Sequence, residues 1–297
     1  MRQLSFKHVA IWVLLLLNAL PVISQTTPPS YRIAACDWMM LKRQKLGEFK
    51  LAHDLGADGV EVDMGALGNR TLFDNQLRSP QQAEKFVSAS TEYQVAVPSM
   101  AMSGFFAQSF LKRDNYTDLL SDCFLTMRLF GSKVAFLPLG GSGKAWQQSG
   151  SDDYRLLVTR LKTAGQMAAH EGVTIGIRTG MGAKFDKRLL KDVGSNHVKV
   201  YYNFQDAIDN GRDICKELRQ LGTNNIIQIH ASNTDGVNLR EDSKIDMPKI
   251  KKTLDKMRWS GWLVVERSRD VKRIRDVNYN FGRNIAYLKE VFQDQLP

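Results

Sequence analysis

Residues that can move protons occur at the ends of short apolar runs in this chain. Glu61 and Asp63 lie in the run Gly-Val-Glu-Val-Asp. His230 ends the run Ile-Ile-Gln-Ile-His, and Glu266 ends Trp-Leu-Val-Val-Glu. Carboxylates and imidazoles are the common groups of general acid–base chemistry. The sequence therefore offers several candidate proton-transfer groups, each placed where a strand would end.

Other polar residues at similar positions suit a ligand with many hydroxyl groups. Carboxylates, amides and arginine hydrogen-bond to hydroxyls, and tryptophan covers the apolar face of a sugar. The predicted ligand-binding residues are Asp37, Trp38, Asp63, Lys144, Asn203, Gln205, Asn233 and Arg267. An alternative for Asp37, Glu61 and Asp63 is that they only cap loops.

Eight strands alternating with helices are expected to position these residues. Short β-branched runs alternate with longer amphipathic stretches. Several helical stretches end at a glycine, which accepts the left-handed conformation that closes a helix. The predicted strands are Arg32–Cys36, Gly59–Asp63, Gln94–Pro98, Lys133–Leu137, Val173–Arg178, Val198–Tyr202, Asn225–His230 and Trp262–Glu266. The predicted helices are Leu46–Leu55, Pro80–Tyr93, Asp114–Phe130, Ser151–His170, Asp186–Val193, Ile208–Leu221, Met247–Met257 and Asn280–Phe292.

This pattern predicts an α/β fold, a single-domain (β/α)8 TIM barrel over residues 26–297. An open doubly wound sheet is the alternative. That fold usually carries a glycine-rich phosphate turn after its first strand, where this chain has Cys36-Asp37-Trp38-Met39. In a barrel the carboxyl ends of all strands meet at one mouth, so the polar residues named above would gather there.

Three segments carry a resemblance to a known family. Gly59–Asp63, Gln228–His230 and Gly261–Glu266 resemble the xylose isomerase-like TIM barrels in their order and spacing. This superfamily includes sugar phosphate isomerases and epimerases as well as endonuclease IV-type barrels. The resemblance covers residues 31–293. It implies a carbohydrate ligand and proton transfer beside a divalent metal, often Mn or Mg.

The chain departs from the family at the implied metal site. The family's ligands are Glu after strand five, Asp after strand six, His in strand seven and Glu at the end of strand eight. Here these positions are Arg178, Asn203, His230 and Glu266. Arginine has no acceptor atom and stays charged, so it cannot ligate a cation. We therefore expect no resident metal; if Mn or Mg binds, Glu266, His230 and Asn203 are the expected ligands.

Three arrangements of Arg178 stay open. Its guanidinium can occupy the place of the cation and pair with Glu266, preferably in bidentate geometry. It can instead turn toward an anionic substrate. In the third arrangement, Glu61 or Asp63 recruits a shifted metal together with His230 and Glu266.

The resemblance implies a sugar isomerase or epimerase, or a lyase. The expected catalytic residues are Glu266 as base, His230 and Arg178 as electrophilic groups, and Glu61. The alternative is a non-catalytic carbohydrate-binding relative. Nucleic-acid cleavage in this superfamily needs a multi-metal cluster rich in histidine, and the chain has only five histidines. We therefore expect a small carbohydrate partner and no nucleic acid.

The amino-acid composition excludes several other classes of protein. The chain has 297 residues, 43% hydrophobic and 24% charged, which is typical of a folded globular protein. Its three cysteines are widely spaced, which argues against a disulfide framework or a zinc knuckle. The net charge of +10 is spread along the chain and indicates a solvated basic surface. The segment Gly140–Lys144 lacks the spacing of a phosphate-binding P-loop.

Residues 1–25 are expected to be a signal peptide. Arg2 and Lys7 precede an apolar stretch over residues 9–22, which is shorter than the roughly 20 residues that span a bilayer. Cleavage near Ser24 or Gln25 would leave no membrane anchor. It would lower the net charge from +10 to +8 by removing these two cations. The expected location is exported, either periplasmic or secreted, in a bacterium.

Overall fold

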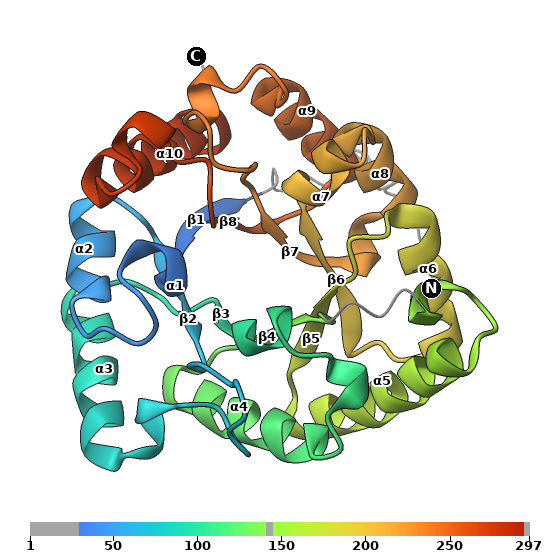
Figure 1. Cartoon of the computed structure of the whole chain (residues 1–297). Helices are drawn as coiled ribbons and strands as arrows, with labels where there is room; N and C mark the ends of the chain where they lie inside the picture. Colours follow the sequence, from blue (N-terminus) through green and yellow to red (C-terminus); the bar gives the residue numbers. More distant parts are fainter. Residues whose placement is uncertain (1–29, 141–144, 294–297) are drawn as a thin grey trace, which may run out of the picture.

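A closed barrel of eight parallel strands forms the centre of the molecule (Figure 1). The computed structural model describes residues 30–140 and 145–293, so the predicted signal peptide and Lys144 lie outside the described residues. The strands pair in sequence order, and β8 pairs back onto β1. The strands are β1 Tyr31–Cys36, β2 Gly59–Asp63, β3 Ser99–Ala101, β4 Val134–Pro138, β5 Thr174–Arg178, β6 Val198–Asn203, β7 Ile226–His230 and β8 Gly261–Val265.

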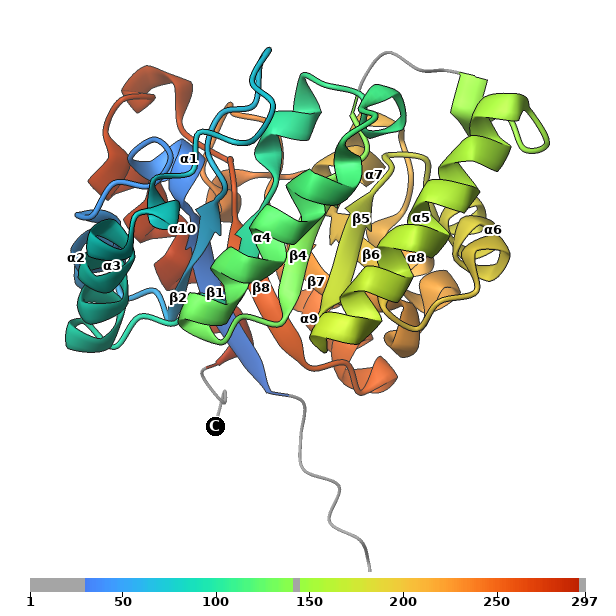
Figure 2. The same cartoon turned by 90° about the horizontal axis from the view of Figure 1, so that it is seen from below.

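The longer helices surround this barrel on the outside, and the short helices α1 and α7 follow directly on the carboxyl ends of β1 and β6 (Figure 2). The helices are α1 Asp37–Met40, α2 Glu48–Asp54, α3 Pro80–Glu92, α4 Tyr116–Phe130, α5 Asp152–Glu171, α6 Ala183–Val193, α7 Phe204–Asp209, α8 Ile214–Leu221, α9 Met247–Met257 and α10 Val277–Phe292. The order of elements confirms the predicted (β/α)8 barrel. In residues 30–140 and 145–293 there is no helix with the length and apolar character needed to cross a bilayer.

Local sequence signals explain where the helices stop. Gly131, Gly172 and Gly194 follow α4, α5 and α6 with φ of 65°, 63° and 67°. This left-handed conformation strains residues that carry a Cβ atom. Each of these glycines ends its helix and turns the chain toward the next strand.

Two predicted elements were wrong. The third strand begins at Ser99 rather than within Gln94–Pro98, and Ala96 makes only an isolated bridge with Gly59. Pro98 has no amide hydrogen to donate to a neighbouring strand. The predicted helix Ile208–Leu221 is two helices, α7 and α8. The break lies at Gly211, whose φ is 64°, and Asp213 then caps α8 through the amide of Lys216.

Candidate functional site

A chain of polar contacts crosses the barrel interior near the carboxyl ends of the strands. Nε2 of His230, at the end of β7, lies 2.7 Å from Oε1 of Glu61 on β2. Nδ1 of His230 lies 3.7 Å from Oε2 of Glu266, which follows β8. All three side chains are buried. The barrel thus brings together the predicted catalytic residues Glu61, His230 and Glu266, and Arg178 joins them through Glu266.

Glu61 is an acceptor for several donors. Its Oε2 accepts hydrogen bonds from Ser99 Oγ at 2.6 Å and from Tyr201 Oη at 2.7 Å. Burial, reinforced by Glu61, raises the pKa of Tyr201 well above its ordinary value, so the phenol keeps its proton and donates. A carboxylate has acceptor positions for all these donors. Glu61 therefore fits as an acceptor, with His230 donating from Nε2 and presenting Nδ1 toward Glu266.

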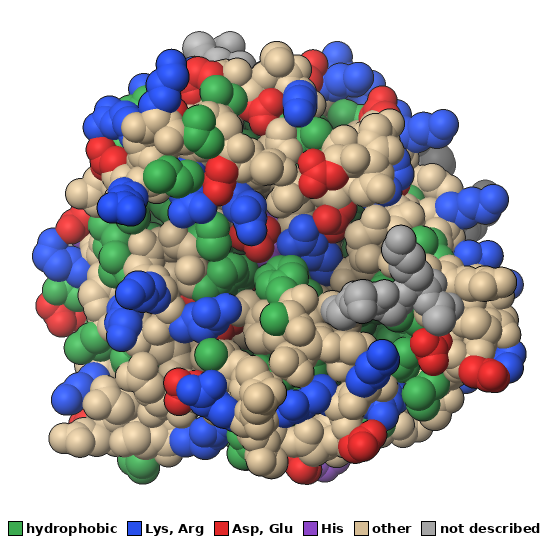
Figure 3. Space-filling model, in the orientation of Figure 1, with side chains coloured by type: hydrophobic (Ala, Val, Ile, Leu, Met, Phe, Trp, Pro, Cys, Tyr) green, Lys and Arg blue, Asp and Glu red, His purple; other side chains and the backbone are tan. Residues whose placement is uncertain are grey.

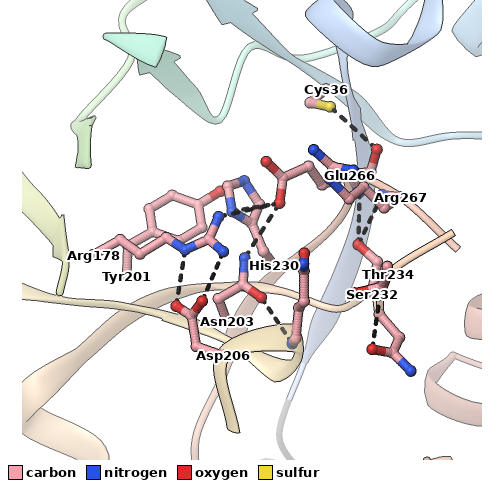
Figure 4. A network of polar contacts seen from close by, with 12 residues as sticks. Cys36, Arg178, Tyr201, Asn203, Asp206, His230, Ser232, Thr234, Glu266 and Arg267 are labelled. Atoms are coloured by element: carbon pink, nitrogen blue, oxygen red, sulfur yellow. Dashed lines mark hydrogen bonds and ion pairs between the residues drawn. The ribbon is translucent and has the colours of Figure 1, made fainter. Parts of the chain in front are cut away.

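The guanidinium of Arg178, at the end of β5, lies between two carboxylates (Figure 4). Nε and Nη2 each donate to Asp206 at 2.8 Å, and Nη1 lies 3.4 Å from Oε2 of Glu266. Asn203 donates to the same Glu266 oxygen at 3.2 Å. Burial alone would lower the pKa of Arg178, but Glu266 and Asp206 outweigh burial and raise it. Arg178 is therefore a fixed cation beside Glu266, although its bidentate partner is Asp206.

Aromatic rings enclose His230. Its ring centroid lies 4.4 Å from that of Tyr201, 4.8 Å from that of Phe136 and 6.0 Å from that of Trp38. Trp38 is stacked on Phe136, with an interplanar angle of 6°. The predicted ligand-binding residue Trp38 thus lies directly beside His230 and is partly exposed.

Asp37 and Asp63 have a different environment from Glu61. Asp37 Oδ2 accepts from the amides of Gln44 and Asp63, and Asp63 accepts from the amide of Ser103. Arg43 pairs with Asp63 at 2.7 Å. Burial, together with the charge of Asp63, raises the pKa of Asp37 well above its ordinary value. Burial also outweighs Arg43 and raises the pKa of Asp63 to about 6. These contacts favour the loop-capping alternative for both residues.

The other predicted ligand-binding residues lie farther along the same loops. The side chain of Asn233 is buried and donates to Asp242 at 2.7 Å. Gln205 donates to Asp209 at 3.3 Å. Arg267 is 40% exposed, 3.8 Å from Asp235. None of these contacts reaches Glu61, His230 or Glu266, so a ligand role for the three stays a prediction.

Asp206 and Tyr201 were missed by the sequence analysis. Tyr201 precedes Asn203 by two residues on β6, and this spacing alone places both on one face of the strand. Asp206 lies in the first turn of α7, where Asn203 caps the helix through the amide of Gln205. Only the short helix α7 turns Asp206 toward Arg178, and no local pattern of residues predicted a helix beginning at Phe204.

A second set of polar contacts holds the backbone on either side of Arg178 and Asp206. Arg212 lies 2.9 Å from Glu217 and donates to the backbone carbonyl of Asp206. Thr179, which follows Arg178, donates to the buried Asp186. Burial raises the pKa of Asp186 to about 7. This network fixes the loop between β5 and α6.

We expect Asp186 to make the stability depend on pH. An unfolded aspartate titrates near 3.8, so between about pH 4 and 7 the folded protein holds a proton that the unfolded chain has released. The free energy of unfolding should therefore fall as pH rises through this window, by up to about 1.4 kcal/mol per pH unit. In Asp186→Asn, the free energy of unfolding should depend less steeply on pH, as measured by urea denaturation at several pH values. The exposed Glu84→Gln is the control, and an unchanged slope in Asp186→Asn would contradict the assignment.

The sequence matches the family profile described as xylose isomerase-like TIM barrel over residues 49–291. The chain belongs to this family. No curated protein matches it. The barrel is similar to a 3-keto-D-glucoside 4-epimerase from E. coli, with 15% identity, a TM-score of 0.70, and coverage of 88% of this chain and 100% of the other.

Two further members of this fold group are similar in structure. One is a D-psicose 3-epimerase from Clostridium cellulolyticum H10, with 12% identity, a TM-score of 0.69, and coverage of 88% and 99%. The other is a family 2 AP endonuclease from Brucella melitensis, with 13% identity, a TM-score of 0.64, and coverage of 88% and 98%. At these identities the similarity concerns the fold.

The residues at the metal position of the xylose isomerase-like barrels do not fit a divalent cation here. Arg178 offers only donors. Its guanidinium contacts both Asp206 and Glu266, the nearest acidic side chains. A dication close to Arg178 would meet a repulsion of about 4 kcal/mol per unit-charge pair at 4 Å and an effective dielectric of 20.

Proposed function

We propose that this protein is a sugar isomerase- or epimerase-like enzyme that moves a proton on a carbohydrate at the barrel mouth. The observation that carries the proposal is the carboxylate of Glu266, which lies 3.4 Å from Arg178 and 3.7 Å from His230. A base flanked by cationic or proton-donating groups suits proton abstraction next to a carbonyl. The similarity to two sugar epimerases in fold agrees with this reaction class.

In the proposed step, Glu266 takes the proton from the carbon next to the substrate's carbonyl. The electrons of the C–H bond form a carbon–carbon double bond, and the carbonyl electron pair moves to oxygen as an enolate. Arg178 stabilises this oxygen by charge and hydrogen bonding. If a proton shifts between the two substrate oxygens and Glu266 returns its proton to the neighbouring carbon, the product is the isomer. If water donates a proton to the other face and Glu266 passes its own proton to solvent, the product is the epimer.

The charge around Glu266 favours an uncharged sugar. Three carboxylates, Glu61, Asp206 and Glu266, face one guanidinium and an imidazole. Most donors of Arg178 are already engaged by Asp206 and Glu266. An anionic substrate would have to displace these contacts, which argues against the arrangement in which Arg178 turns toward a phosphate or carboxylate.

We also propose that the site works without a resident divalent metal. Arg178, held by Asp206, would supply the positive charge that a cation supplies in relatives with the full ligand set. This assigns Arg178 a polarising role and Asp206 a positioning role.

Solvent deuterium incorporation tests the proposed reaction. Wild-type protein in D2O, incubated with a panel of ketohexoses and 3-keto-glucosides, should exchange the hydrogen next to the carbonyl. Glu266→Gln should slow this exchange by about 100-fold because the base is lost. The surface variant Glu241→Gln is the control. Exchange that survives Glu266→Gln would contradict the role of Glu266. Sugar binding without exchange in the wild type would instead favour the non-catalytic carbohydrate-binding relative.

We propose export from the cell on the basis of residues 1–25. The mass of the protein isolated from its native host tests this, because cleavage near Gln25 would remove the charged segment with Arg2 and Lys7.

A further inference from the structure

Phe106 is an exposed aromatic side chain at the barrel mouth. Seven large hydrophobic side chains are exposed in the described part of the chain, and Phe106, at 41%, is the one aromatic among them. Exposing a phenyl ring to water is unfavourable. Its neighbour Phe105 is fully buried. The chain therefore turns one phenylalanine into the core and leaves the next one uncovered.

The uncovered ring lies next to the proposed catalytic groups. The guanidinium carbon of Arg178 is 5.4 Å from the centre of the Phe106 ring. The ring is 5.9 Å from Phe136, which in turn stacks on Trp38. Figure 3 shows hydrophobic side chains at the hollow centre of this face, with charged side chains beside them. Phe106 thus extends an aromatic wall from Trp38 toward Arg178.

The segment that carries Phe106 is firmly held. It is the single turn Ser103–Phe106 after β3. Asp63 accepts from the amide of Ser103, and Arg43 donates to the Ser103 hydroxyl. Gly140 packs so closely that an added Cβ would lie 1.5 Å from the carbonyl oxygen of Phe105. Asp63, Arg43 and Gly140 thereby fix the backbone beneath Phe106, so its ring is presented in a defined position.

We propose that Phe106 is a stacking platform for the apolar face of a sugar bound in its closed-ring form. This inference rests on the proposed function and adds the form of the substrate, a pyranoside whose carbonyl is on a ring carbon, because a ring-closed ketohexose has no free carbonyl. A pyranose ring gathers several C–H groups on one face, which match a flat aromatic surface. A linear polyol has no such continuous face. A ring stacked on Phe106 would place its hydroxyl edge toward Arg178 and Glu266.

Binding measurements with ring and linear probes test the platform. The probes are the methyl pyranosides of glucose, galactose and mannose, and the linear alditols glucitol, galactitol and mannitol, titrated by calorimetry. We expect at least one pyranoside to bind more tightly than its alditol. Phe106→Ala should weaken that binding by about tenfold, as expected for a lost aromatic contact, and Phe106→Tyr should restore it. Leu125→Ala, which removes an exposed apolar side chain from α4, should leave the affinity unchanged.

Two results would overturn the platform while leaving the proposed function in place. One is pyranoside binding that is unchanged in Phe106→Ala. The other is alditol binding as tight as pyranoside binding, with the same response to Phe106→Ala. Absence of binding by every probe would count against both proposals. Thermal unfolding of each variant shows that it is folded.

Discussion

Replacing Glu61 by alanine is expected to lower the free energy of unfolding by about 3–5 kcal/mol. The carboxylate accepts from Ser99, Tyr201 and His230 in the barrel interior. Its removal leaves three buried donors without their acceptor and opens a cavity. Urea denaturation at pH 7 measures the change.

Two further variants test whether the lower free energy of unfolding comes from loss of the carboxylate. Ser99→Ala removes one donor and should cost only about 1 kcal/mol. Glu61→Gln keeps the volume but loses the charge and one acceptor oxygen, so its cost should lie between those of the other two. A loss below about 1 kcal/mol in Glu61→Ala would mean that the interior contacts of Glu61 do not stabilise the barrel.

The double variant Arg178→Glu with Asn203→Asp is expected to bind Mn²⁺ about a thousandfold more tightly than the wild type. Removing one fixed positive charge at about 4 Å relieves about 4 kcal/mol of repulsion for each of the two charges of Mn²⁺ at an effective dielectric of 20, and a thousandfold gain needs only about half of this total. The two new carboxylates join His230 and Glu266 as oxygen and nitrogen ligands. Without metal, the clustered carboxylates should lower the melting temperature, and Mn²⁺ should restore it.

The melting temperature, measured as a function of Mn²⁺ concentration, tests this prediction. Asn203→Asp alone keeps Arg178 and is the matched control, with little expected response. Wild-type protein should show no dependence on Mn²⁺. If the wild type is stabilised as strongly as the double variant, the metal-free proposal is wrong, and Arg178 does not prevent cation binding.

Much of the fold was predictable because its signals are local. The bounds of β2 and α9 were predicted to the residue. The apolar run Gly59–Asp63 and the amphipathic stretch Met247–Met257 can each be recognised from their own residues, without reference to distant parts of the chain. The third strand was missed because its place depends on pairing. Ser99 pairs with Val134 of β4, and the alternating residues before Pro98 resembled a strand equally well.

The candidate site was predictable in part for the same reason. Strand ends located Glu61, Arg178, His230 and Glu266, and the structure places their side chains in one connected set. Asp63 carries the same local signal as Glu61, yet it binds loop backbone. That difference arises from distant partners, the loop residues Arg43 and Ser103, which no local pattern links to Asp63.

The contacts of Glu61 with Ser99, Tyr201 and His230 have a consequence for the order in which the protein folds. The donors to Glu61 come from β3, β6 and β7, so the acidic centre is complete only after the sheet closes. An intermediate in which the first half of the chain has folded contains Glu61 and Ser99 but neither Tyr201 nor His230. The proposed reactivity toward sugars would then arise only when the barrel closes, and half-folded chains would lack it.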